Sequence, residues 1–298
     1  MNATLRQLRV FQSVARTRNF SRTGEAVGLT QPAVSRSISD LERGLGVRLL
    51  DRTTREVALT EAGRSLSARL DRALDELDTV LSDIAGLADA DGGKVRVASS
   101  PTLSAYLMPA CIAACARAAP RVRFLLLDRI QQDVLESVRG GEVDFGMVVQ
   151  PRDADDLHCE PVLRDPFVAV TPQRHRLARH ATVRWKALAG EPLVLLDAAS
   201  GSRRYVDEAL AQHGVSCPVA QELGHATTAF EMVEAGIGIT VMPRLAVPPR
   251  GLPGLAVRPL APRLERTVML VRRHDRALSP VAERVWGIVS ATVRGRKA

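Results

Sequence analysis

The chain has 298 residues, of which 46% are hydrophobic and 3% aromatic, and its formal net charge at pH 7 is +8. This length allows two or three domains, whose cores must be built from Ala, Val and Leu rather than from aromatic residues. No run of 18 or more apolar residues occurs, and the N-terminal MNATLRQLRV lacks the apolar core of a signal peptide. We therefore expect a cytoplasmic protein without a membrane partner.

The charge is unevenly distributed along the chain. Residues 1–65 hold 11 Arg and 6 acidic residues, a net charge of +5, whereas residues 66–91 hold 2 Arg and 7 acidic residues, a net charge of −5. The N-terminal part is basic enough for contact with phosphates, and the acidic middle is not a DNA surface. Residues 92–298 carry the remaining +8, which is compatible with an organic anion as a ligand.

Three short helices are predicted near the N-terminus. The first is indicated by an apolar stripe with helical spacing, Leu5, Leu8, Phe11 and Ala15. Ser21 is the predicted N-cap of the second helix, because its hydroxyl can accept from an orphan backbone N–H. Gly28 allows a sharp turn after it. Thr30 is the predicted cap of the third helix, and Pro32 falls in its first turn, where a missing N–H costs little.

The third helix has two different faces. Apolar side chains recur at spacings of four, three and four on one face: Val34, Ile38, Leu41 and Leu45. The opposite face carries Pro32, Arg36, Ser39 and Arg43, flanked by Gln31 and Ser35. Gln, Ser and Arg are side chains that contact base edges and phosphates in a major groove. The pattern favours DNA contact, although an ordinary solvent-exposed helix would also explain it by itself.

A hairpin-like wing is expected over residues 47–60, where two short apolar runs surround Asp51-Arg52-Thr53-Thr54-Arg55. Arg52 and Arg55 suit contact with phosphates or with the minor groove. A solvated hairpin without a DNA role is the alternative, particularly for Arg55.

A long helix should begin at Thr60. Its apolar residues follow spacings of 4, 3, 4, 3, 4 and 3: Leu66, Leu70, Ala73, Leu77, Val80, Ile84 and Leu87. A period of 3.5 is typical of helices that pair along their length, so a dimer is favoured. Packing of this stripe onto the chain's own globular part is the alternative. The segment Ala88-Asp89-Ala90-Asp91-Gly92-Gly93 then resembles a hinge.

Strands and helices alternate through the rest of the chain. Strands are predicted over 94–99, 122–127, 143–149, 167–170, 193–196, 219–222, 238–241 and 267–272, and helices over 103–118, over 130–139 and from about 279. This alternation indicates an open, mainly parallel α/β sheet. Its layout suits two small α/β subdomains that are joined by two crossovers.

The chain resembles the LysR-type transcriptional regulators. The resemblance is carried by LTQPAVSRSISDLERGLGVRLLDR, by the following LTEAG, and by KVRVASSPTLSAYLMP, GEVDFGMV, HRLA and AFEMVEAGIGITVMP further on. It implies a winged helix-turn-helix domain over 1–60, with the helix-turn-helix at about 20–39, and a linker and dimerisation helix over 61–91. An effector-binding domain of periplasmic-binding-protein type follows over 92–298. Its two Rossmann-like α/β subdomains are expected at about 92–162 with 268–298, and at about 163–267.

The same resemblance assigns the DNA contacts residue by residue. Gln31, Pro32, Ser35 and Arg36 are expected in the major groove, with Ser21, Arg52 and Arg55 as further contacts. Pairing of two linker helices would place two recognition helices about a two-fold axis, so the expected operator in double-stranded DNA is an interrupted inverted repeat. A tetramer is implied by the resemblance alone, and RNA polymerase stays open as a further partner.

Candidate effector-binding residues are expected where strands end, because ligands of open α/β sheets bind outside the carboxyl ends of strands. By resemblance the first candidates are Ser99, Ser100, Thr102, Ser200, Gly201, His225 and Thr227, with Arg203 as a partner for an acid group and Val149 and Gln150 as wall. Hydroxyls and N–H groups at a helix start favour a carboxylate or another anion. Simple N-capping explains one of the hydroxyls after the first strand.

Catalysis is not expected. No G-x-S-x-G, H-E-x-x-H or paired-carboxylate motif occurs, and His225 has no evident acid or nucleophile partner, so neither a metal nor a cofactor is predicted. The four cysteines, Cys111, Cys115, Cys159 and Cys217, are interpreted as buried thiols in preference to a redox-sensing pair. The alternatives for function are a solute-binding protein without a DNA role, an enzyme that uses the cleft, and a ligand-independent repressor of the same family.

Overall fold

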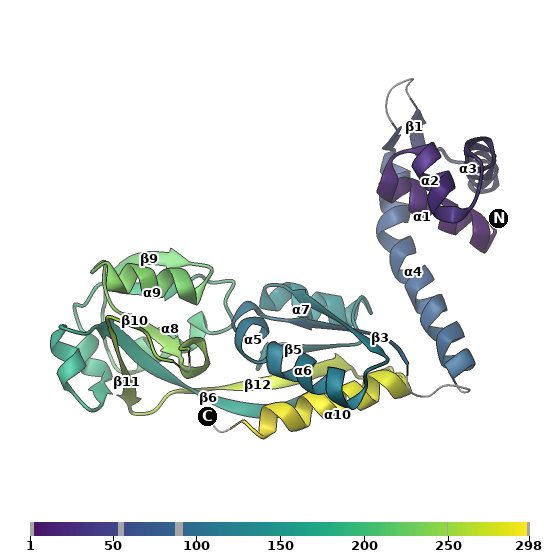
Figure 1. The fold of residues 1–298 in the computed structure, drawn as a ribbon. Coiled ribbons are helices and arrows are strands. Elements are labelled where there is room, and N and C mark those ends of the chain that lie inside the picture. The colour runs from purple at the N-terminus through teal and green to yellow at the C-terminus, as the bar shows by residue number, and fades with distance from the viewer. Residues whose placement is uncertain (1–2, 53–56, 87–91, 249, 297–298) are drawn as a thin grey trace. The chain divides into compact units, whose positions relative to one another are not determined.

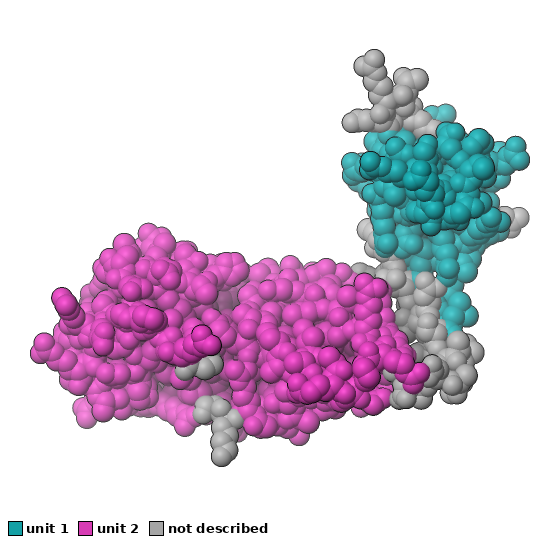
Figure 2. Space-filling view, in the orientation of Figure 1, with its two compact units in different colours: residues 1–85 teal, residues 86–298 magenta. Residues whose placement is uncertain are grey.

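The structure, a computed structural model, describes residues 3–52, 57–86, 92–248 and 250–296 (Figure 1). The chain divides into two compact units, residues 1–85 and 86–298, which Figure 2 shows in different colours. Each unit has its own hydrophobic core.

The first unit consists of three short helices, a two-stranded hairpin and a long helix. These are α1 (Leu5–Thr17), α2 (Phe20–Val27), α3 (Gln31–Leu45), β1 (Leu50–Arg52), β2 (Val57–Leu59) and α4 (Glu61–Gly86). The strands of the hairpin are antiparallel, with Leu50 opposite Leu59. The core contains the predicted apolar face of α3 together with Val10, Phe11 and Val14 of α1. Burial of these side chains, about 1.5–3 kcal/mol for each, holds the unit together.

The start of α2 differs from the prediction. Asn19, not Ser21, is the N-cap, and its Oδ1 accepts from the N–H of Arg22 at 3.0 Å. The helix already begins at Phe20, so Ser21 lies exposed in its first turn. The predicted turn at Gly28 is present with a φ of 67°. Thr30 occupies the N-cap position of α3, although its side chain caps no N–H there.

The first turns of α4 belong to the first unit. A Cβ on Gly63 would lie 2.0 Å from the carbonyl oxygen of Leu49, so only glycine fits at this position of the LTEAG motif. Leu70 and Leu74 are buried in the core of the unit, whereas Ala73 is exposed. The early part of the predicted dimer seam therefore serves the unit's own core in part, and its last member, Leu87, lies outside the described residues.

The second unit is built on an eight-stranded sheet of described residues with the order β4-β3-β5-β12-β6-β11-β7, in which β10 also pairs with β6. Its strands are β3 (Gly93–Ser99), β4 (Val122–Asp128), β5 (Phe145–Val149), β6 (Leu157–Pro172), β7 (Val183–Arg184), β10 (Thr240–Pro243), β11 (Leu255–Ala261) and β12 (Glu265–Arg273). A separate parallel pair is formed by β8 (Leu193–Leu196) and β9 (Val219–Leu223).

The expectation of a mainly parallel sheet is corrected at its centre. β3 pairs in parallel with β4 and β5, but β6 is antiparallel to β10, β11 and β12. The reason is that β6 is one strand of 16 residues, of which only 167–170 were predicted, and it runs through both halves of the unit. The crossover from one half to the other is thus itself a strand.

Helices cover both faces of the sheet in each half of the unit (Figure 1). In one half α6 (Met108–Ala118) and α10 (Pro280–Arg294) pack on one face and α7 (Gln131–Arg139) on the other. In the other half α8 (Arg203–Gln212) and α9 (Ala226–Glu234) contribute to two further cores. Along β6, Leu163 packs with the first half and Phe167 with the second, so the hydrophobic cores change between these residues.

The helix predicted over 103–118 is interrupted. It forms α5 (Pro101–Tyr106) and α6, with Leu107 between them. Pro109 explains the break, because proline inside a helix lacks an N–H and clashes with the carbonyl four residues earlier.

Candidate DNA-binding surface and effector cavity

The predicted base-reading side chains lie on the outer side of α3. Gln31, Pro32 and Arg36 are exposed and Ser35 is half-buried, whereas Val34 and Ile38 on the opposite side are fully buried. Arg36 has no hydrogen-bond or ion-pair partner within the described part of the chain, so its guanidinium is available to a ligand. Further along the helix, Nη1 of Arg43 lies 2.9 Å from Oδ1 of Asp40. The N-terminal half of α3 therefore presents the unpaired guanidinium of Arg36 to solvent.

The hairpin is tied to the recognition helix. The side chain of Glu42 on α3 accepts from the N–H groups of Leu49 and Leu50 at 2.8 and 3.1 Å. These hydrogen bonds hold the start of β1 against the C-terminal part of α3. Arg55 and the side chain of Arg52 lie outside the described residues, so both remain predictions.

A small cavity of about 120 Å³ lies between the two halves of the second unit. Six of the predicted effector residues line it: Ser100, Thr102, Val149, Ser200, Gly201 and His225. These residues lie at the carboxyl ends of β3, β5, β8 and β9 or shortly after them, as expected for ligands at strand ends. They come from both halves, so a ligand in the cavity would contact both.

Four predicted effector residues lie outside the lining. Ser99 is fully buried, and its hydroxyl makes no hydrogen bond to the described residues. The guanidinium of Arg203 forms ion pairs within the protein, with Asp207 at 2.9 Å and with Glu222 at 2.8 Å. Gln150 and Thr227 are also absent from the cavity wall.

Sequence reasoning missed the charged part of the wall. Arg266 lines the cavity and is 2% exposed, and its Nε donates to Oδ2 of Asp165 at 2.9 Å. The other carboxylate oxygen, Oδ1, accepts from the N–H of Leu245 at 3.0 Å, and Nη1 of Arg266 donates to the hydroxyl of Ser202. Asp165 and Arg266 are opposite each other on β6 and β12. Burial raises the pKa of Asp165 and lowers the pKa of Arg266, while their mutual attraction opposes both shifts.

Further contacts join the two halves beside the cavity. Oε1 of Gln131, at the start of α7, accepts from the N–H of Val149 at 3.1 Å, and the same amide lies against Gly201. On α8, Nη2 of Arg204 donates to the carbonyl of Gln150 at 2.5 Å. Gln131 and Asp197 both follow strand ends, so the rule used for the other candidates could have found them.

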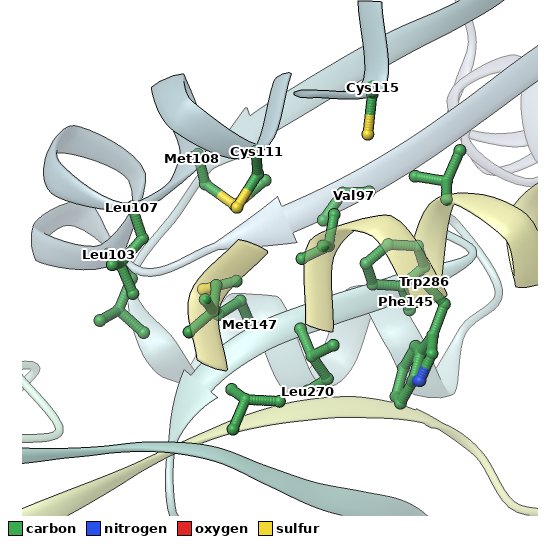
Figure 3. Close-up of a cluster of buried hydrophobic side chains, with 14 of the residues drawn as sticks. Val97, Leu103, Leu107, Met108, Cys111, Cys115, Phe145, Met147, Leu270 and Trp286 are labelled. Carbon is green, nitrogen blue, oxygen red and sulfur yellow. The ribbon is translucent and has the colours of Figure 1, made fainter. Parts of the chain in front are cut away.

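Two of the four cysteines, Cys111 and Cys115, are buried as predicted, whereas Cys159 and Cys217 are half-buried. Cys111 and Cys115 on α6 belong to the same cluster of buried side chains as Met108, Phe145 and Trp286, and Cys111 lies beside Met108 (Figure 3). Burial, helped by Cys115, raises the pKa of Cys111 to about 12, and burial also raises the pKa of the other three cysteines. Buried thiols such as Cys111 and Cys115 are inert, because the thiolate is the reactive form. The prediction of a buried thiol is wrong for Cys159 and Cys217, which keep part of their surface exposed.

Neither a membrane span nor a metal site is found among the residues that the structure describes. None of the helices within these ranges is long and apolar enough to cross a membrane. Over the same residues, no group of three or more His, Cys, Asp or Glu side chains is placed to hold a metal ion.

Comparison with known proteins decides the family. Residues 5–64 match the bacterial regulatory helix-turn-helix protein, lysR family, and residues 88–294 match the LysR substrate binding domain. The chain belongs to the LysR family of transcriptional regulators. It is 50% identical over 302 residues to the HTH-type transcriptional regulator YfeR of Shigella flexneri, covering 100% of this chain and 98% of the relative.

Solved structures of LysR-type regulators share the fold. A full-length OxyR variant from Pseudomonas aeruginosa matches with a TM-score of 0.71 and 27% identity, covering 99% of both chains. CbnR, in a complex with its target DNA, matches with a TM-score of 0.74 and 20% identity, covering 97% of this chain and 99% of that one. The winged helix-turn-helix and the two α/β subdomains predicted from the sequence are thereby confirmed. This LysR-type regulator has a DNA-binding helix-turn-helix and an effector-binding domain.

Proposed function

We propose that this regulator acts in the cytoplasm as a homodimer that reads an interrupted inverted repeat and responds to a small molecule held in the cavity of its second unit. The observation that carries the DNA part is the exposed, unpaired Arg36 beside Gln31 on the outer face of α3. Arginine and glutamine in this position suit bidentate contacts with guanine and adenine. Gln31, Pro32, Ser35 and Arg36 would enter the major groove, and Ser21, Arg52 and Arg55 would contact the neighbouring backbone.

Pairing through α4 is supported by its surface. Leu81 is 48% exposed although it is a large apolar side chain, and it lies next to the predicted seam position Leu77. A second copy of α4 would cover this apolar surface, as in paired helices generally. We extend the proposal to a tetramer and to contact with RNA polymerase on family membership alone.

The effector would bind where the two halves of the second unit meet. Ser100 and Thr102 come from one half and Ser200, Gly201 and His225 from the other, so a ligand that contacts both sets stabilises one arrangement of the halves over others. The proposed effector presents an anionic group to these hydroxyls and to Arg266. A change in the second unit that alters the spacing of the paired DNA-binding units would couple the two sites.

Capture and sequencing of genomic fragments bound by the purified full-length protein, at a low and a higher salt concentration, tests this proposal. Enrichment of an inverted repeat that persists at the higher salt is expected. Diffuse binding that disappears with salt would contradict it, because counterion release alone then accounts for the affinity.

A further inference from the structure

The end of the second unit next to β7 is strongly basic. Residues 172–190 contain four Arg, one Lys and no acidic residue, a net charge of +5. They follow β6 and form β7 between two short 3-10 helices, η1 (Arg176–Arg179) and η2 (Trp185–Leu188). Residues 92–298 carry +8 in all, so this segment holds more than half of their excess positive charge.

The fold buries the apolar side chains of this segment and leaves its cations outside. The apolar residues belong to the buried core of this half: Leu177, Val183, Trp185 and Leu188. Four cations of the same segment are exposed: Arg174, Arg179, Arg184 and Lys186. We call these four side chains the basic edge, because β7 is the last strand of the sheet on this side.

The four cations of the basic edge lack partners within the described part of the chain. None of their side chains forms an ion pair or a hydrogen bond there. Arg176, the fifth cation of the segment, is by contrast paired with Glu191 at 2.6 Å. Arginines elsewhere in the second unit are also paired, for example Arg129 with Glu142 at 2.6 Å. Exposed, unpaired cations keep their full capacity to bind an external anion.

The basic segment extends along the whole of β11. β6 ends beside the start of β11, with Pro172 opposite Leu255, whereas β7 lies beside its end, with Val183 opposite Leu260. Five residue steps of a strand, at 3.3–3.4 Å each, span about 17 Å. Arg174 and Arg184 follow these two points closely in the chain, so the basic edge extends over roughly this distance.

The length and the charge of the basic edge fit the backbone of DNA. One strand of a duplex carries a phosphate about every 3.4 Å along its axis, so about five phosphates fall within roughly 17 Å. The planar guanidinium of arginine suits phosphate oxygens. We propose that the basic edge is a second DNA-contacting surface, which binds phosphates of the operator duplex. This inference rests on the proposed reading of an operator by α3 and adds a contact from the effector-binding domain.

A second copy of the chain offers a competing polyanion, residues 66–91, whose net charge is −5. An α-helix rises about 1.5 Å per residue, so about 11 of these residues span 17 Å and carry a net charge of about −2. The phosphates of one DNA strand supply about twice this charge over the same length. The charge density therefore favours DNA over a second copy.

Lys186 allows a direct test, because the chain has only three lysines, Lys94, Lys186 and Lys297. The full-length protein is acetylated briefly with N-hydroxysuccinimide acetate, with and without the captured operator, and each lysine is quantified by mass spectrometry. We expect the operator to lower the acetylation rate of Lys186 severalfold. Lys94, which is exposed on β3, is the internal control and should keep its rate.

Two results of this labelling experiment overturn the proposal. One is an acetylation rate of Lys186 that the operator does not change. The other is protection of Lys186 that appears without DNA as the protein concentration is raised, which would assign the basic edge to contact with a second copy.

The salt dependence of operator affinity counts the phosphate contacts independently. The edge variant combines Arg174→Gln, Arg179→Gln and Arg184→Gln in the full-length protein. Each phosphate contact contributes about 0.9 to the slope of log K against log[salt], so this variant should lose roughly 2–3 units of slope. It should also bind the operator at least about tenfold more weakly at 0.1 M salt. Fluorescence anisotropy over a series of salt concentrations measures both quantities.

A control variant removes the same charge from other parts of the second unit. Arg117→Gln, Arg123→Gln and Arg164→Gln replace three exposed arginines of α6, β4 and β6 that also lack partners among the described residues. This variant should keep the wild-type slope and affinity. A wild-type slope in the edge variant overturns the proposal. An equal loss in both variants also overturns it, because net charge alone would then explain the effect.

The two levels of the proposal fail differently. An edge variant that binds the operator as the wild type does would remove the basic edge from the DNA contacts and leave the proposed function intact. Loss of specific DNA binding by the wild-type protein in the capture experiment would overturn the proposed function itself.

Discussion

Gly201 packs directly against the side-chain amide of Gln131 where the two halves of the second unit meet. A Cβ on Gly201 would lie 2.1 Å from Oε1 of Gln131, and this oxygen is held in place by the N–H of Val149. The contact requires glycine because of space, and the φ of Gly201 is not in the left-handed region. This contact limits how closely the two halves of the second unit approach each other beside the cavity.

Gly201→Ala should therefore displace the terminal amide of Gln131 and break its hydrogen bond with the N–H of Val149. Because this amide is the end of a flexible side chain, we expect the free energy of unfolding to fall by only about 0.5–1.5 kcal/mol, the contribution of one hydrogen bond. Chemical denaturation of the full-length protein measures this value. Adding Gln131→Ala should add little to the loss, because the hydrogen bond is already broken.

A matched control for that substitution is available in α10. Gly287 has nothing within 4 Å of a Cβ, so Gly287→Ala should stabilise the protein by about 0.5–1 kcal/mol through helix propensity. If Gly201→Ala were as harmless as Gly287→Ala, the close contact with Gln131 would not exist in solution.

Arg36→Ala tests the base-reading face of α3. Removal of this exposed, unpaired guanidinium should weaken specific DNA binding by about 1–3 kcal/mol and relax the preference at one base pair. Fluorescence anisotropy with the captured operator and with a scrambled sequence measures both effects. Arg43→Ala, on the same helix but paired with Asp40, should have the smaller effect. Unchanged affinity and sequence preference in Arg36→Ala would remove Arg36 from the proposed interface.

Leu81→Asp tests pairing through α4. The side chain of Leu81 is 48% exposed in the single chain, so replacing it should leave the first unit folded. A charge beside a helix–helix seam disfavours association, so sedimentation should show a shift from dimer toward monomer. Ser65→Asp changes an exposed residue of the first turns of the same helix and should leave the dimer intact. A fully dimeric Leu81→Asp protein would place the interface elsewhere.

Cys111 should be unreactive in the folded protein. Because its pKa is raised to about 12, less than about one thiol in a thousand is ionised at pH 8, compared with roughly a quarter for an ordinary cysteine. Mass spectrometry after a short iodoacetamide pulse at pH 8 should find Cys111 unlabelled in native protein and labelled in guanidinium chloride. Rapid labelling of the native protein would show that the core around α6 opens.

The sequence predicted the DNA-binding unit closely because its signals are local. The turn at Gly28, Pro32 in the first turn of α3 and the buried stripe of that helix depend on neighbours within a few residues. The predicted N-cap of α2, Ser21, was wrong for an equally local reason. Asn19, two residues earlier, accepts from the N–H of Arg22 and starts the helix. Pro109 indicates the break between α5 and α6, but the prediction of one continuous helix followed the apolar spacing and did not take this proline into account.

The cavity was less predictable because tertiary pairing assembles it. Serine and threonine after strand ends could be found from the order of strands and helices. Arg266 could not, since nothing in its neighbours shows that β12 will lie beside β6 and place it opposite Asp165. Arg203 was predicted to pair with an acid group of the ligand, but it pairs with Asp207 on its own helix and with Glu222 on β9.

Hydroxyl-radical footprinting of the full-length protein on the captured operator tests the central claim most directly. A dimer that places two α3 helices about a two-fold axis should protect two half-sites whose centres are one helical turn, about 34–36 Å, or a multiple of it apart. Scrambling either half-site should weaken protection of both. A single protected segment, or protection that is indifferent to sequence, would contradict the account.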